Sequence, residues 1–65
     1  MKAEVDYGEW KEGVTFDVEG EDLDEIFSEI EKVVAAEGYE GDVVQIWELP
    51  DRKLLFDYWN GGYSL

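Results

Sequence analysis

The 65-residue chain is 45% hydrophobic and contains one proline, a composition typical of one small globular domain, and we expect residues 1–65 to form a single domain. It has no cysteine and no histidine, which excludes disulfides, thiolate or imidazole metal ligands and imidazole catalysis. Eighteen acidic against five basic residues give a formal charge of −13, which disfavours nucleic acid or an anionic membrane as a direct partner and favours a basic surface.

Two segments near the start of the chain have the pattern of strands. In residues 3–7 and again in residues 14–18, apolar side chains alternate with polar ones. This period of two predicts strands with one apolar face. The segment Gly8 to Gly13 would join them as a hairpin. If residues 3–7 are irregular, only one strand precedes the helix described next.

Residues 20–38 have the pattern of an amphipathic helix. The apolar residues that recur with a helical period are Leu23, Ile26, Phe27, Ile30, Val33 and Val34. Asp22 is the expected N-cap, Glu25 three residues later completes a capping box, and Gly38 is the expected left-handed C-cap. The sequence therefore predicts both ends of this helix.

The remaining segments predict a second hairpin. Residues 43–49 and 53–59 flank Pro50-Asp51-Arg52, a typical turn sequence, and residues 60–65 have turn composition and are expected to fray. The expected class is α+β, with a single amphipathic helix on one face of a small three- or four-stranded antiparallel sheet. The expected order is strand, strand, helix, strand, strand, and the sequence does not decide whether the first of these strands forms.

Acidic residues concentrate around the expected helix. Eight carboxylates and no cation occur between Asp17 and Glu31. Like-charged pairs four residues apart, such as Glu21 with Glu25, destabilise a helix by roughly 0.2–0.5 kcal/mol each, so helix stability does not explain them. One interpretation is an ordinary solvated face, for which a salt-rich cytoplasm is a further explanation. The other is a surface that imitates a phosphate backbone, because helical turns advance about 5.4 Å and phosphates on one DNA strand about 3.4 Å. The candidate contact acids are Glu21, Asp24, Glu25, Glu29 and Glu31, with Asp22 kept as the cap.

The sheet is expected to present aromatic side chains on its other face. With Gln45 and Asp57 directed outward, the residues expected under the helix are Val44, Ile46, Leu54, Phe56 and Tyr58, and those expected on the opposite face are Trp47, Leu55 and Trp59. These rings either form a second small core or anchor a protein interface. Trp47 and Trp59 are therefore further candidate partner-binding residues.

Other functions have little support in the sequence. No D-x-[DN]-x-[DN]-G calcium loop, dinucleotide-binding or Walker motif occurs, and neither Ser28 nor Ser64 has a histidine to activate it. We therefore expect no enzyme activity, no cofactor and no metal site. No apolar run approaches the roughly 20 residues of a membrane span and the first residues lack a signal-peptide pattern, so a cytoplasmic monomer is expected.

Four features together resemble a known family. They are the strand Val14-Thr15-Phe16-Asp17-Val18, the helix opening Glu21-Asp22-Leu23-Asp24-Glu25, the segment Tyr39-Glu40-Gly41-Asp42-Val43-Val44 and the hairpin through Pro50-Asp51. The chain resembles the small acidic phage anti-CRISPR proteins, most of all those directed at type I systems, including the type I-C group. The resemblance implies a DNA-mimicking inhibitor that occupies the basic surface with which a Cascade-type complex grips target DNA and its PAM. The alternative is a small acidic adaptor or assembly module that binds through the aromatic sheet face.

Overall fold

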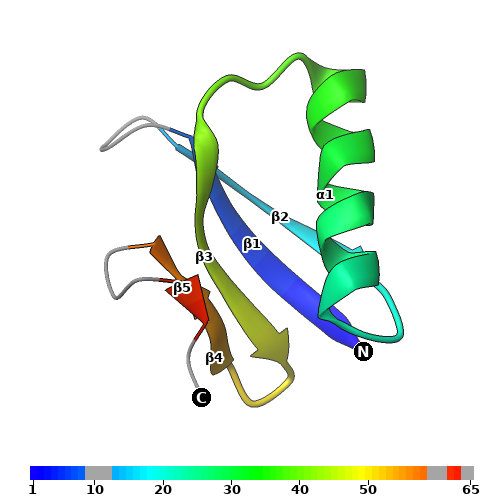
Figure 1. The fold of residues 1–65 in the computed structure, drawn as a ribbon, viewed down its shortest axis with the longest axis vertical. Coiled ribbons are helices and arrows are strands. Elements are labelled where there is room, and N and C mark those ends of the chain that lie inside the picture. Colours follow the sequence, from blue (N-terminus) through cyan, green and yellow to red (C-terminus); the bar gives the residue numbers. More distant parts are fainter. Residues whose placement is uncertain (9–12, 59–61, 64–65) are drawn as a thin grey trace.

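The computed structural model describes residues 1–8, 13–58 and 62–63, and in them one helix packs on an antiparallel sheet (Figure 1). The elements in chain order are β1 (Lys2–Gly8), β2 (Val14–Glu19), α1 (Leu23–Glu37), β3 (Asp42–Leu49), β4 (Lys53–Asp57) and β5 (Gly62–Tyr63). This arrangement confirms the predicted α+β class. The four longer strands agree with the expected sheet, to which the two-residue β5 is added.

The first strand lies inside the sheet, which has the order β2-β1-β3-β4-β5. Strand β1 pairs antiparallel with β2 on one side and with β3 on the other. The alternative in which the first segment is irregular is therefore wrong. Because α1 connects β2 to β3, the chain passes from one side of β1 to the other, and the helix lies across one face of the sheet (Figure 1).

The core lies between α1 and the inner strands. Val5 of β1 pairs with Phe16 of β2 and with Ile46 of β3, so the three side chains share the face under the helix. From the helix, Ile26 and Ile30 are buried against them. The expected apolar faces of residues 3–7 and 14–18 are thus confirmed.

Both ends of α1 are capped as predicted. At the start, Asp22 has extended backbone angles and its carboxylate accepts a hydrogen bond from the backbone N–H of Glu25 at 2.9 Å. At the end, Gly38 has a left-handed φ of 72° and its N–H donates to the carbonyl of Val34 at 2.9 Å. The chain leaves the helix at Gly38 and enters β3 four residues later.

A bulge in β4 exchanges the predicted faces of two leucines. Ile46 pairs with Phe56 but Trp47 pairs with Leu54, so Leu55 is an extra residue in β4. Leu54 therefore lies beside Trp47 on the face away from the helix, and Leu55 packs against the core, the reverse of the prediction. The predictions for Ile46, Phe56 and Trp47 are correct.

A second register shift lies between β1 and β3. Asp6 pairs with Gln45 and Tyr7 pairs with Val43, which leaves Val44 as the extra residue. Val43 packs against the core in its place. A one-residue insertion of this kind moves neighbouring side chains to the opposite face, so simple alternation predicts them incorrectly.

The end of β4 also differs from the prediction. The strand ends at Asp57, and Tyr58 is 60% exposed instead of lying under the helix. Asp57 pairs with Gln45 on the face away from the helix, as predicted, but it is only 6% exposed. The chain folds back beside it, since Gly62 of β5 pairs with Asp57. Residues 62–63 are therefore a strand and not a frayed tail.

Candidate functional site

The helix directs its acidic side chains outward. We call Glu21, Asp24, Glu25, Glu29 and Glu31 the acidic face. Four of these are exposed, and the side chain of Glu29 is 40% exposed. The structure therefore brings all five predicted contact acids to α1 or to the residues just before it.

The acids on the helix form two rows instead of one continuous line. Because successive residues turn by about 100°, Asp24 and Glu31 fall on one edge of the exposed side, and Glu25 and Glu29 fall on the other. The exposed Ser28 and Lys32 lie between the rows. Asp24 and Glu31 are two helical turns apart, about 10 Å along the helix axis. This row therefore has one carboxylate every two turns and not one on every turn.

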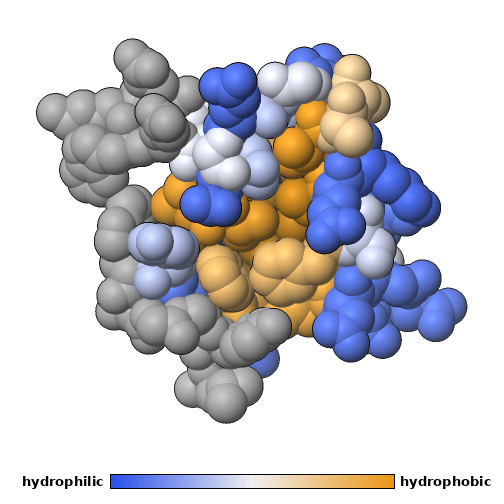
Figure 2. Space-filling view, turned by 45° about the horizontal axis from the view of Figure 1, so that its top comes forward, coloured by the Kyte–Doolittle hydropathy of each residue, from blue (hydrophilic) through white to orange (hydrophobic). Residues whose placement is uncertain are grey.

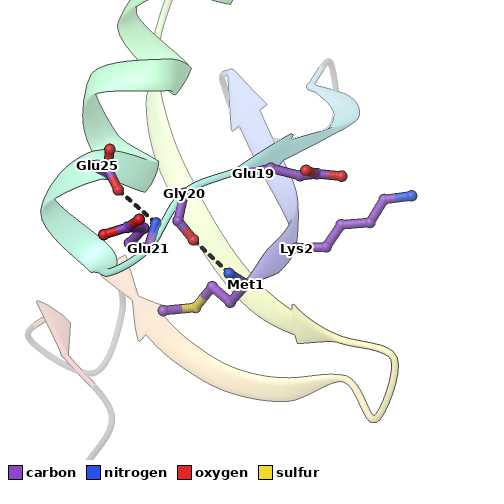
Figure 3. A pocket seen from close by; sticks show the side chains of 6 residues that line it. All are labelled: Met1, Lys2, Glu19, Gly20, Glu21 and Glu25. Carbon is purple, nitrogen blue, oxygen red and sulfur yellow. Dashed lines mark hydrogen bonds between the residues drawn. The ribbon is translucent and has the colours of Figure 1, made fainter.

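Glu25 and Glu21 are tied to the helix N-terminus. The carboxylate of Glu25 accepts a hydrogen bond from the backbone N–H of Glu21 at 2.6 Å, and Figure 3 shows its side chain turned back toward that residue. Both belong to a hollow of about 510 Å³ whose lining residues are Met1, Lys2, Glu19, Gly20, Glu21 and Glu25. The Met1 amine donates to the carbonyl of Gly20 and brings positive charge to this end of the helix. The side chain of Lys2 points away from Glu21 and Glu25 (Figure 3). The predicted capping box is confirmed in one half, the bond from the Glu25 N–H to Asp22, and differs in the other, because the Glu25 carboxylate accepts from Glu21 instead of Asp22. Glu25 therefore has a structural role.

Asp24 and Glu31 are the acids most available to a partner. Glu29 accepts from Lys32 at 3.0 Å, one turn further along the helix. The carboxylates of Asp24 and Glu31 make no hydrogen bond or ion pair within the described part of the chain. The same is true of the Glu21 carboxylate, but the backbone N–H of Glu21 takes part in the bond to Glu25, so Asp24 and Glu31 are the two acids outside the helix cap.

Two cations pair with acids on the opposite side of the molecule. Lys2 lies 3.9 Å from Asp17, and Arg52 donates to Glu4 at 2.9 Å. These residues lie on the sheet face away from α1, where β1 and β2 present their polar side chains. Among residues 1–8 and 13–58, these two cations therefore compensate acids of the sheet and leave Asp24 and Glu31 of the helix without an ion pair.

The aromatic candidate on the sheet is partly covered. Trp47 pairs with Glu4 of β1 and Leu54 of β4, and the guanidinium carbon of Arg52 lies 4.7 Å from its ring centroid. Its Nε1 is buried and has no hydrogen-bond partner among the described residues. Trp59, the other predicted aromatic contact, lies outside the described residues.

A second hollow, which we call the groove, lies between α1 and the start of β3. It has a volume of about 200 Å³ and is lined by Tyr7, Phe27, Ile30, Glu31, Val34, Asp42 and Val43. Figure 2 shows apolar side chains gathered in the middle of one face of the molecule, with hydrophilic ones above and to the right of them. The sequence predicted most of these residues as core but gave no signal that a groove would form, because the groove depends on where the helix lies over the sheet.

Other kinds of site find no support in residues 1–8, 13–58 and 62–63. No group of three or more acidic side chains there is arranged to hold a metal ion. The described helix is too short and too polar to cross a membrane. No protein-family model matches the chain, and the comparisons with curated proteins and with solved structures give no match either.

Proposed function

We propose that the protein is a non-enzymatic inhibitor that acts as an acidic DNA mimic. Its acidic face occupies the basic DNA-binding surface of a CRISPR Cascade-type complex and thereby blocks binding of target DNA and its PAM. On this proposal the protein is encoded by a phage and acts as a monomer in the cytoplasm of the host. Lysine and arginine side chains that normally hold phosphates pair with carboxylates of α1 instead.

The observation that supports this proposal most is the uneven pairing of charge. Asp24 and Glu31 have no ion pair with the rest of the described chain, while Lys2 and Arg52 pair with acids of the opposite face. With a net charge of −13, the protein would be attracted to a basic groove over long distances, and this attraction is screened over about 8 Å at physiological salt.

The fold also fixes the helix backbone from which the carboxylates project. Asp24 and Glu31 lie on a helix whose opposite side is fixed by the buried Ile26 and Ile30 and whose first turn is capped by Asp22. A binding surface that is already ordered loses less conformational entropy when it binds. This suits competition with DNA, whose phosphates are also held at regular spacing.

The experiment that tests this function compares two double variants with equal charge change. Asp24→Lys with Glu31→Lys alters the acidic face, and Glu40→Lys with Asp51→Lys alters exposed acids elsewhere. We expect the first pair to weaken displacement of labelled PAM-containing duplex from a purified type I Cascade complex at least tenfold, and the control pair to change it far less. Equal effects would show that only net charge matters and would contradict the proposal.

The alternative, an adaptor that binds through the sheet face, is supported by Trp47. Its ring lies away from the helix, and its buried Nε1 makes no hydrogen bond to the described residues. On this alternative, Trp47→Ala weakens partner binding and reversal of Asp24 and Glu31 has little effect. Raising the salt concentration also distinguishes the two functions. A complex with the partner that depends on the acidic face dissociates at high salt, whereas one that depends on the ring of Trp47 persists.

A further inference from the structure

The groove has an apolar floor that α1 leaves incompletely covered. Ile30 is 2% exposed, whereas Val34 of α1 and Val43 of β3 are only partly buried. One end is fixed by Tyr7, whose hydroxyl donates to the carbonyl of Gly41 at 2.9 Å. The groove therefore has apolar side chains from both the helix and the sheet, and one of its ends is tied to the loop between them.

The dimensions of the two layers explain why the floor is open. Neighbouring strands are about 4.8 Å apart and a helix with its side chains is about 10 Å wide, so one helix covers roughly two strands. Among the strands, α1 has its closest packing against β2, at one edge of the sheet. The strands on the other side of β1 (Figure 1) are thus less covered. The groove lies where β3 begins.

Both sides of the groove carry negative charge. Glu31 lies on the helix side and Asp42 on the strand side, and no lysine or arginine is among the lining residues. An apolar floor between two carboxylates is complementary to an apolar side chain that has lysine or arginine beside it. The volume of about 200 Å³ is below the roughly 300–1,000 Å³ typical of small-molecule sites, which favours a single side chain as the occupant.

We propose that the groove receives a large apolar side chain from a cationic segment of the bound partner, with the flanking cations paired to Glu31 and Asp42. This inference takes from the proposed function only that the partner is a basic DNA-binding protein. Glu31 belongs to both surfaces, so a partner on the acidic face would reach the groove. The apolar contact would select among basic proteins, because charge alone attracts all of them.

Nuclear magnetic resonance titration of the ¹⁵N-labelled full chain tests the groove directly. The probes are three short synthetic peptides of equal length, one of lysine and leucine, one of lysine and serine, and one of glutamate and leucine. We expect the lysine–leucine peptide to shift the amide signals of Ile30, Val34 and Val43 and to bind at least about tenfold more tightly than either other peptide. Equal binding of the lysine–serine peptide, or shifts confined to residues outside the groove, would overturn the inference.

Two variants keep the test specific to the groove. Glu31→Lys reverses the charge of one rim residue, and its matched control is Glu37→Lys, an exposed acid of α1 that does not line the groove. We expect Glu31→Lys to weaken binding of the lysine–leucine peptide several-fold and Glu37→Lys to leave this binding nearly unchanged. The same loss in both variants would mean that the rim is not recognised.

A variant of the floor separates this inference from the proposed function. Val34→Thr keeps the shape of the side chain but replaces one methyl group with a hydroxyl, and a native amide spectrum confirms folding. If Val34→Thr weakens both binding of the lysine–leucine peptide and displacement of DNA, both proposals hold. If it weakens binding of the peptide but leaves DNA displacement intact, the groove binds cationic segments but the inhibited partner does not use it. In that case the inference fails while the proposed function stands. If the peptide binds as expected and the protein displaces no DNA, the proposed function fails alone.

Discussion

The carboxylate of Glu25 and the backbone N–H of Glu21 form a hydrogen bond of 2.6 Å that closes the first turn of α1. Two members of the acidic face are thus joined to each other, and Glu25 also donates its own N–H to Asp22. A charge reversal at Glu25 would disturb the helix N-terminus as well as any partner contact. Binding experiments on the acidic face should therefore use Asp24 and Glu31.

The cap leads to a first prediction, on stability. Glu25→Ala removes the acceptor for the Glu21 N–H and should lower the free energy of unfolding by about 1 kcal/mol. Glu25→Gln keeps an acceptor oxygen and should cost only about 0.3–0.5 kcal/mol through the lost charge near the helix N-terminus. Urea denaturation followed by circular dichroism measures both. Equal losses for the two variants would show that the hydrogen bond has no stabilising role.

The second prediction concerns the loop from α1 to β3. A Cβ at Gly41, whose φ is 117°, would lie 2.6 Å from the backbone carbonyl carbon of Gly8, so Gly41→Ala requires β1 and the loop to move apart. At Gly38, with φ of 72°, a Cβ would meet nothing within 4 Å, and alanine should cost only about 1–2 kcal/mol. Gly41→Ala should therefore have the lower melting temperature. The opposite order in thermal melts would contradict the close approach of Gly41 to Gly8.

The third prediction concerns the ring of Trp47. Arg52→Ala removes the guanidinium above the indole and the ion pair with Glu4, and should lower the free energy of unfolding by about 0.5–1 kcal/mol. Arg52 has a positive φ of 57°, and alanine at this position would have the same backbone cost. This cost therefore contributes little to the difference in stability between the two proteins. The indole N–H resonance of Trp47 should shift in Arg52→Ala and stay nearly unchanged in the control Lys53→Ala. A similar shift in both variants would contradict the stacking.

The fourth prediction concerns the core under the helix. Ile26 is fully buried, and Ile26→Ala should cost about 2–5 kcal/mol, whereas Ile26→Val should cost about 0.5–1.5. A 65-residue domain has a total stability of only about 3–10 kcal/mol, so the alanine variant should lose a large share of it. Urea titrations of the two variants check this. A difference below about 0.5 kcal/mol between them would mean that the helix does not pack through Ile26.

The features that the sequence predicts correctly are local ones. Helical period, Asp22 and Gly38 define α1 within a few consecutive residues, and alternation defines the apolar faces of β1 and β2. The exposure of Asp24, Glu25 and Glu31 follows from the same helical period, whereas Glu21 precedes the N-cap. The sequence does not specify which acids are already engaged, although Glu25 in a capping box was an indication.

The features that the sequence does not predict depend on pairing between distant segments. The bulge that exchanges Leu54 and Leu55 arises from the register of β4 against β3. The ion pair between Arg52 and Glu4 joins residues 48 positions apart, and it covers the ring of Trp47. The groove likewise requires Val34 of the helix and Val43 of the sheet to lie on either side of one hollow. Each depends on the relative placement of whole elements, which no short pattern encodes.

The central claim is that the protein and DNA compete for one basic surface, and a binding competition tests it most directly. The affinity of the protein for a purified type I Cascade complex is measured at increasing concentrations of unlabelled PAM-containing duplex. Competition predicts that the apparent dissociation constant of the protein rises in proportion to the duplex concentration once the complex is saturated. An unchanged dissociation constant, with protein and duplex bound to the same complex at once, would contradict DNA mimicry.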